Sequence, residues 1–299
     1  MSHLVAYFGN EPENLACALF FARNALYTHD HVEGWALGFV QGGDVLLQKR
    51  PRANTAEVDF YTLSRNLNAD ALIGRVGLGK EGNRSAENAD PFRYRAWLFG
   101  AVGHIPKFEL VRERMLESTP DFLRRNIRGQ SAGEHLFHLF LANLHTAGLL
   151  DVPTPNPGRV NQALLQALGT LGELLEHAQA GAAAGAGAGA VAHGHSTALT
   201  AVVTNGRCLV AANHGHAAQF LRVDGIADCP VCHDRVHGDG HAHAKGRRIA
   251  HEALRAIILE ADARTQGRAG WKPVPDGTSL VAGPDRVPHL VSAAASAST

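Results

Sequence analysis

Residues 2–12 read Ser-His-Leu-Val-Ala-Tyr-Phe-Gly-Asn-Glu-Pro, and this stretch decides how the rest of the chain is interpreted. It is a short apolar run that ends in a turn-like Gly-Asn pair, which predicts a buried strand. Residues 35–39 and 44–48 are two further apolar runs, and the Gly-containing connection between them is typical of a β-hairpin. Residues 71–76 and 96–101 predict two more strands. We therefore expect the first third of the chain to consist mostly of sheet.

The middle of the chain has a helical pattern. Residues 134–144 carry leucines and phenylalanines at helical spacing, which predicts an amphipathic helix. Residues 160–177 repeat that pattern after a proline-rich break at 153–157. Much later in the chain, residues 248–261 are also predicted to form a helix.

Strand patterns return after this helical region. Residues 199–203 and 208–212 are apolar runs on either side of Asn205-Gly206, a pair that favours a hairpin because both residues tolerate positive φ. Residues 278–282 predict a late strand. Since strands precede and follow the helices, the order favours an α+β fold over alternating βαβ units.

Composition limits the class of protein. The chain has 299 residues, of which 45% are hydrophobic, and its 28 basic and 28 acidic residues cancel. This balance predicts neither a nucleic-acid nor an anionic-membrane partner. No run approaches the roughly 20 apolar residues that span a bilayer, and no secretory signal is visible. Four cysteines are too few for a disulfide framework, so we expect reduced thiols and a cytoplasmic location.

Two segments differ in composition from the rest of the chain. Residues 178–195 are mainly alanine and glycine, with little side-chain surface to bury, which predicts a flexible insertion. Residues 228–246 are rich in cysteine and histidine, and we interpret them as a second insertion. The remainder is expected to form a single domain over residues 1–299.

Three further segments extend the pattern that begins at residue 2. They are Gly-Trp-Ala-Leu-Gly-Phe at 34–39, Glu-Asn-Ala-Asp-Pro-Phe at 87–92, and Trp-Leu-Phe-Gly-Ala-Val-Gly at 97–103. In their order and spacing these segments resemble class II glutamine amidotransferases, whose domain has the N-terminal-nucleophile hydrolase fold. The resemblance implies a four-layer αββα sandwich with mainly antiparallel sheets.

The resemblance also implies an active site, and several of its positions are changed here. The family's nucleophile is a cysteine exposed by removal of Met1, whose own α-amine can act as its base. Ser2 occupies that position and is the candidate nucleophile. The arginine that holds the substrate carboxylate aligns with Gly77. Arg75 lies two residues earlier on the same face of a strand, which makes it a candidate substrate anchor, and Arg84 is another.

Two more positions are changed. Gly103 matches the glycine of the family's oxyanion strand, but Val102 replaces the asparagine that stabilises the oxyanion. Losing one such donor costs on the order of 3 kcal/mol of transition-state stabilisation. Residues 131–134, Ser-Ala-Gly-Glu, resemble a Thr-Asp-Ser-Glu motif at a helix start. There Ala132 replaces the aspartate that would hold the substrate's amine.

These changes lead to one leading hypothesis and two alternatives. The leading hypothesis is a degenerate amidotransferase-like protein, a pseudoenzyme that acts as a binding or regulatory module for a small amino-acid-like or amide ligand and requires no cofactor. The first alternative is an active amidohydrolase that uses Ser2 on another carboxamide. The second is a zinc-binding protein whose functional part is the cysteine-containing segment.

The cysteine-containing segment carries the metal hypothesis. Cys229 and Cys232 form a Cys-x-x-Cys pair, which is half of a tetrahedral zinc site. His233 and His237 are the candidate partner ligands, with His241 and His243 as further choices. A histidine-rich surface loop without metal is the alternative. The Cys-x-x-Cys-His pattern also matches covalent haem attachment, but that requires export, and no signal for export is visible.

Overall fold

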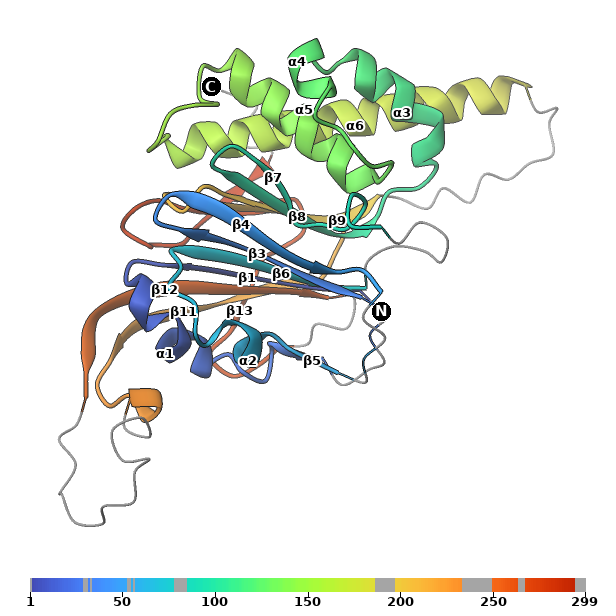
Figure 1. The fold of residues 1–299 in the computed structure, drawn as a ribbon. Coiled ribbons are helices and arrows are strands. Elements are labelled where there is room, and N and C mark those ends of the chain that lie inside the picture. Colours follow the sequence, from blue (N-terminus) through green and yellow to red (C-terminus); the bar gives the residue numbers. More distant parts are fainter. Residues whose placement is uncertain are drawn as a thin grey trace, which may run out of the picture.

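Two large antiparallel sheets face each other, with helices on both outer faces (Figure 1). The computed structural model describes residues 2–28, 32, 34–52, 55, 57–77, 85–185, 197–232, 249–262 and 267–293, with side chains omitted at 181–185. The four layers confirm the predicted αββα sandwich of the α+β class. Among the helices of these residues, none has both the length and the apolar character needed to cross a membrane.

The first sheet contains the strand at the start of the chain. Within the described residues its order is β13-β11-β12-β1-β6-β3-β4, and its pairings are antiparallel. The strands are β1 (His3–Gly9), β3 (Trp35–Gln41), β4 (Asp44–Arg50), β6 (Ala71–Val76), β11 (Ala218–Ile226), β12 (His251–Asp262) and β13 (Lys272–Pro273). A separate two-stranded ladder pairs β2 (Tyr27–Thr28) with β5 (Val58–Asp59).

The second sheet is assembled mainly from the middle and the end of the chain. In the part of the chain that the structure describes, its order is β15-β14-β10-β9-β8-β7. The strands are β7 (Phe92–Tyr94), β8 (Trp97–His104), β9 (Ala198–Thr204), β10 (Leu209–His214), β14 (Thr278–Ala282) and β15 (His289–Ser292). The predicted Asn205-Gly206 turn joins β9 to β10, and Gly206 has the expected positive φ of 77°.

The helices cover the outer faces unequally. The short helices α1 (Leu15–Phe20) and α2 (Phe60–Ser64) lie against the first sheet, and the longer helices lie over the second (Figure 1). The longer set is α3 (Phe108–Glu117), α4 (Asp121–Arg124), α5 (Ala132–Thr146) and α6 (Pro157–Gly185).

Alternation along β1 explains why both faces of the first sheet are buried. Leu4, Ala6 and Phe8 lie in the core between the two sheets, while Val5 and Tyr7 lie in the core beneath α1 and α2. Successive side chains of a strand point to opposite faces, so a run without polar residues suits a strand covered on both sides.

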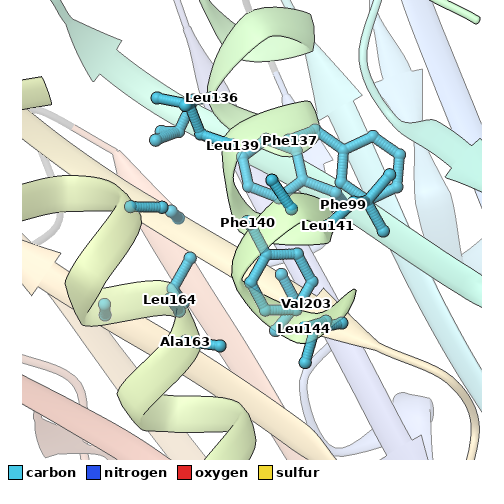
Figure 2. Packing of buried hydrophobic residues seen from close by; sticks show 14 of the residues in the cluster. Phe99, Leu136, Phe137, Leu139, Phe140, Leu141, Leu144, Ala163, Leu164 and Val203 are labelled. Atoms are coloured by element: carbon cyan, nitrogen blue, oxygen red, sulfur yellow. The ribbon is translucent and has the colours of Figure 1, made fainter. Parts of the chain in front are cut away.

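The core under the longer helices is rich in aromatic rings (Figure 2). Phe99 of β8 stacks on Phe137 of α5 with ring centroids 5.3 Å apart. Trp97 meets Phe140 edge to face at 5.5 Å, and its indole nitrogen donates to the Leu150 carbonyl at 3.0 Å. Phe137 and Phe140 belong to the apolar face predicted for residues 134–144.

Two predictions about local structure were wrong. Residues 251–262 form the strand β12 and not a helix, because residues 256–262 pair with β1, and residues 251 and 255–261 pair with β11. The apolar run at its centre, residues 256–259, suits a buried strand as well as a helix, and its partner strands are distant in sequence. Helix α6 also continues to Gly185, into the segment predicted to be flexible from 178. Residues 186–195 and 233–246 of the two predicted insertions lie outside the described residues.

Candidate functional site

Ser2 lies at one end of the first sheet, beside two other segments of the predicted pattern. It directly precedes β1, and the β1–β6 ladder ends at the His3–Val76 pair, so Ser2 and Gly77 are the next residues on the two chains. The Gly77 amide donates to the Gly34 carbonyl at 3.2 Å, which brings the start of β3 to the same edge. Segments at 2, 34 and 77 thus share one end of the first sheet.

Arg75 lies behind this edge, in the layer between the sheets, and its side chain is 8% exposed. Its Nε donates to Asp90 Oδ2 at 3.2 Å and to the Ala101 carbonyl at 2.9 Å, and its Nη1 donates to the His3 carbonyl at 3.5 Å. The guanidinium therefore ties β1 and β6 to β8. This gives Arg75 a structural function, and its contact with a substrate stays a prediction.

The oxyanion-strand positions are part of a regular ladder. Val102 and Gly103 pair with Thr200 and Leu199 of β9. The Val102 side chain is buried in the core between the sheets. Gly103 has φ +130°, and a Cβ built there would lie 2.0 Å from the Ala198 carbonyl oxygen. Close packing of β8 against β9 therefore requires glycine at 103, whether or not the residue contacts an oxyanion.

The motif at the start of α5 builds a loop and a helix cap. The Ser131 hydroxyl accepts from the Glu134 amide at 3.2 Å, which caps the helix. The Glu134 carboxylate accepts from the amides of Arg128 and Gly129 at 2.9 and 2.7 Å. Ala132, between them in the motif, offers a methyl group where the resemblance implies a carboxylate.

A buried polar network next to Ser2 was not predicted from the sequence. Glu260 of β12 accepts from Gln219 at 2.7 Å and from Arg268 at 3.0 Å, and its carboxylate lies 3.6 Å from His3 Nε2. The other ring nitrogen of His3 lies 3.3 Å from the Thr28 hydroxyl. Burial by itself would raise the pKa of Glu260, but the nearby His3 ring, the hydrogen bond from Gln219 and the Arg268 charge outweigh it and lower that pKa.

A second cluster lies on the helix-covered face of the first sheet. Cys17 of α1, Cys229 and Cys232 after β11, and His251 at the start of β12 place one ligand atom each within 4.8 Å of one another. The Cys17 and Cys232 sulfurs are 3.6 Å apart, and Cys232 Sγ is 3.4 Å from His251 Nε2. These four side chains could hold a metal ion.

Burial affects the protonation of the cluster. It raises the pKa of the Cys17 thiol far above its ordinary value, and the neighbouring thiols of Cys229 and Cys232 raise it further. That thiol stays protonated at neutral pH unless a cation lies among the sulfurs. No disulfide joins cysteines within the described residues.

The cluster contains two of the four predicted metal ligands. Cys229 and Cys232 come together as predicted, whereas His233 and His237 lie outside the described residues. The sequence analysis missed Cys17 and His251. Cys17 is more than 200 residues from the Cys-x-x-Cys pair and shares no motif with it, so no local pattern could have identified it.

The fold and the Ser2 edge together define a general class. Two facing antiparallel sheets between helical layers, with the first strand beginning one residue after Ser2, form an N-terminal-nucleophile hydrolase-like fold.

Solved structures place the fold more closely. The chain is similar to a glutamine aminotransferase class-II domain protein from Silicibacter pomeroyi, with 15% identity, a TM-score of 0.53, and coverage of 97% of this chain and 98% of that one. A predicted glutamine amidotransferase from Pseudomonas aeruginosa matches with 14% identity and a TM-score of 0.50, over 97% and 95% of the two chains. An allosteric regulatory enzyme of purine biosynthesis matches with 12% identity and a TM-score of 0.52, over 97% of this chain and 48% of that one.

These similarities establish the fold of a class II glutamine amidotransferase domain over nearly the whole chain, which confirms the resemblance predicted from the sequence. No protein-family model matches the chain, and no curated protein matches it.

Proposed function

We propose that this chain is a degenerate class II glutamine amidotransferase-like protein, which does not hydrolyse glutamine and acts as a binding or regulatory module. Val102 is the observation that carries the proposal. It stands at the position implied for the oxyanion-stabilising asparagine, and its side chain is buried among apolar groups between the sheets. An isopropyl group donates no hydrogen bond. Loss of one oxyanion donor lowers kcat by about 10²–10³-fold.

The substrate carboxylate also lacks its implied partner. Gly77 has no side chain, and its φ of +79° is a conformation that an arginine adopts only with strain. Arg75, the nearest alternative, donates to Asp90 and to the Ala101 carbonyl. A ligand carboxylate would have to compete with both. Weak recognition of glutamine is therefore expected even before any chemistry.

The edge around Ser2 retains features that suit a small polar ligand. Ser2 comes directly before the His3–Val76 pair, so its backbone lies next to Gly77, whose amide donates to the Gly34 carbonyl. Ser2 offers a hydroxyl at this end of the sheet. If Met1 is removed, the α-amine of Ser2 adds a cation at the same edge. We propose a small amino-acid-like or amide compound as the ligand class.

Ammonia release from L-glutamine tests the loss of activity. The wild type, Ser2→Ala, Ser2→Cys, Ser2→Cys/Val102→Asn and the matched control Ser2→Cys/Val102→Ala would be compared. We expect the wild type to equal Ser2→Ala at background. Release that appears with asparagine at 102 but not with alanine would support Val102 as the missing donor. Wild-type release that Ser2→Ala abolishes would show an active enzyme and overturn the proposal.

Intact-mass measurement tests the alternative of an active Ser2 amidohydrolase. Removal of Met1 leaves a free α-amine on Ser2, the base that such chemistry needs. Retention of Met1 would exclude Ser2 as an N-terminal nucleophile.

Thermal-shift titration with L-glutamine and L-asparagine tests ligand binding, with bovine serum albumin as a non-binding reference. An unchanged melting temperature at millimolar concentrations of both would argue against an amino-acid-like ligand.

A further inference from the structure

The cluster of three cysteines and one histidine lies far from Ser2 and takes no part in the proposed function. We propose that Cys17, Cys229, Cys232 and His251 form a structural zinc site that fastens helix α1 to the connection between β11 and β12. The four residues come from three separate segments of the chain, so the fold itself assembles the site.

The distances within the cluster fit a tetrahedral zinc ion. Zn–S bonds of about 2.3 Å and Zn–N bonds of about 2.0–2.1 Å imply edges of about 3.8 Å between two sulfurs and about 3.5 Å between a sulfur and a nitrogen. The Cys17 and Cys232 sulfurs are 3.6 Å apart, and Cys232 Sγ lies 3.4 Å from His251 Nε2. Both edges agree with the expected values. A disulfide would need its sulfurs at about 2.05 Å.

The ligand set selects the metal and the kind of site. Thiolates with one imidazole suit zinc, and four protein ligands leave no open position for water or substrate, as in structural sites. Carboxylates, which would favour magnesium or calcium, are absent from this group of four. The Cys229-x-x-Cys232 spacing presents two sulfurs from one tight turn, and the other two ligands come from separate elements.

The surrounding backbone positions the ligands before any metal binds. The Cys229 amide donates to the Ile249 carbonyl at 2.8 Å, which holds the two ends of the β11–β12 connection together. His251 pairs with Ile226, just beyond a β-bulge with φ +74° at Gly225. A bulge turns the following side chains relative to a regular ladder. Without metal, the Cys17 thiol donates to the Asn14 side-chain oxygen at 4.0 Å, and it would give up this proton on binding zinc.

The location of the cluster indicates a structural role. His3 pairs with Asp262 at one end of β12, and His251 lies eleven residues along the same strand. At about 3.3 Å per residue the cluster is therefore on the order of 35 Å from the Ser2 edge. Cys17 and Cys229 are buried in the core beneath α1 and α2, while Cys232 and His251 are half-buried. A zinc ion here would cross-link residue 17 to a hairpin more than 200 residues away, which restricts the unfolded chain.

Zinc content and cobalt substitution test the proposal on the full-length protein. Protein purified without chelators should contain about one zinc per chain. After zinc removal under reducing conditions, added Co²⁺ should give thiolate-to-cobalt charge-transfer absorption with tetrahedral d–d bands. Zinc below about a tenth of an equivalent, together with no cobalt absorption, would overturn the site. If the protein as purified contains no zinc and mass spectrometry finds a Cys17–Cys232 disulfide in it, that disulfide overturns the zinc site as well.

Substitutions then separate this ligand set from the histidines that follow Cys232. Cys17→Ser and His251→Asn should weaken zinc binding by more than the 10–100-fold that loss of an outer-shell partner costs. His233→Asn and His237→Asn should leave it unchanged, and so should Cys208→Ser, a buried cysteine in the other helix-covered core. Circular dichroism identifies any variant that fails to fold. The cobalt spectrum of the wild-type protein tests the site without the need for a variant. If zinc is lost in His233→Asn or His237→Asn but kept in Cys17→Ser and His251→Asn, the assignment is overturned.

Discussion

The pair between Arg75 and Asp90 allows structural and substrate-anchoring functions to be distinguished. Its two side chains are 8% and 13% exposed, and it joins the first sheet to the second through Asp90 and the Ala101 carbonyl. Arg75→Met keeps the apolar stem of the side chain but removes the guanidinium that pairs with Asp90. The buried Asp90 carboxylate then keeps the hydrogen bond from the Ala101 amide, whose nitrogen lies 2.9 Å from Oδ2. Breaking a buried pair in this way costs about 3–5 kcal/mol. That is a large part of the roughly 5–15 kcal/mol by which domains are stable.

Urea unfolding monitored by circular dichroism measures this cost. Arg75→Met/Asp90→Leu removes both charges, so it should lose less stability than the sum of the single variants Arg75→Met and Asp90→Leu. Arg222→Met is the matched control, because its pair with Asp224 is 40% and 47% exposed and should contribute under about 1 kcal/mol. A loss below about 1 kcal/mol in Arg75→Met, with loss of ligand binding, would refute the structural function and make Arg75 the anchor.

Three further outcomes are expected, each measured by urea unfolding. Burial lowers the pKa of His138 to about 4, so the free energy of unfolding should fall by up to about 3 kcal/mol as the pH drops from 6.5 to 4. His138→Phe should reduce this dependence of the unfolding free energy on pH. An unchanged dependence would contradict the prediction. Gly103→Ala should cost about 3 kcal/mol, because β8 must move away from the Ala198 carbonyl; a neutral result would remove the packing requirement. Because its pKa is lowered when folded, Glu260 stabilises the protein above its unfolded pKa and loses this effect as the pH falls through its folded value. Glu260→Gln should therefore destabilise at pH 7 and much less at pH 3, and an equal loss at both would contradict the Arg268 contact as its cause.

Many features of the fold could be predicted because they depend on neighbouring residues. Strands at 71–76 and 278–282 have the bounds expected from their apolar runs, and α6 begins at Pro157, the last residue of the proline-rich break and three residues before the predicted start. Periodicity failed at 251–262, because residues 256–259 are apolar on both faces and the strand is formed by pairing with β1 and β11. Pattern alone cannot decide between helix and strand in such a segment.

The candidate sites divide in the same way. The sequence by itself predicted that a strand begins beside Ser2, and that Cys229 and Cys232 can form half of a metal site. That valine and glycine stand at the implied donor positions 102 and 77 follows from the resemblance alone and stays a prediction. Only the tertiary structure showed that Arg75 is engaged by Asp90 and that Cys17 and His251 complete the cluster. The reason is physical: residue identity and turn spacing are local, whereas ligand and ion-pair partners are brought together by strand pairings that span most of the chain.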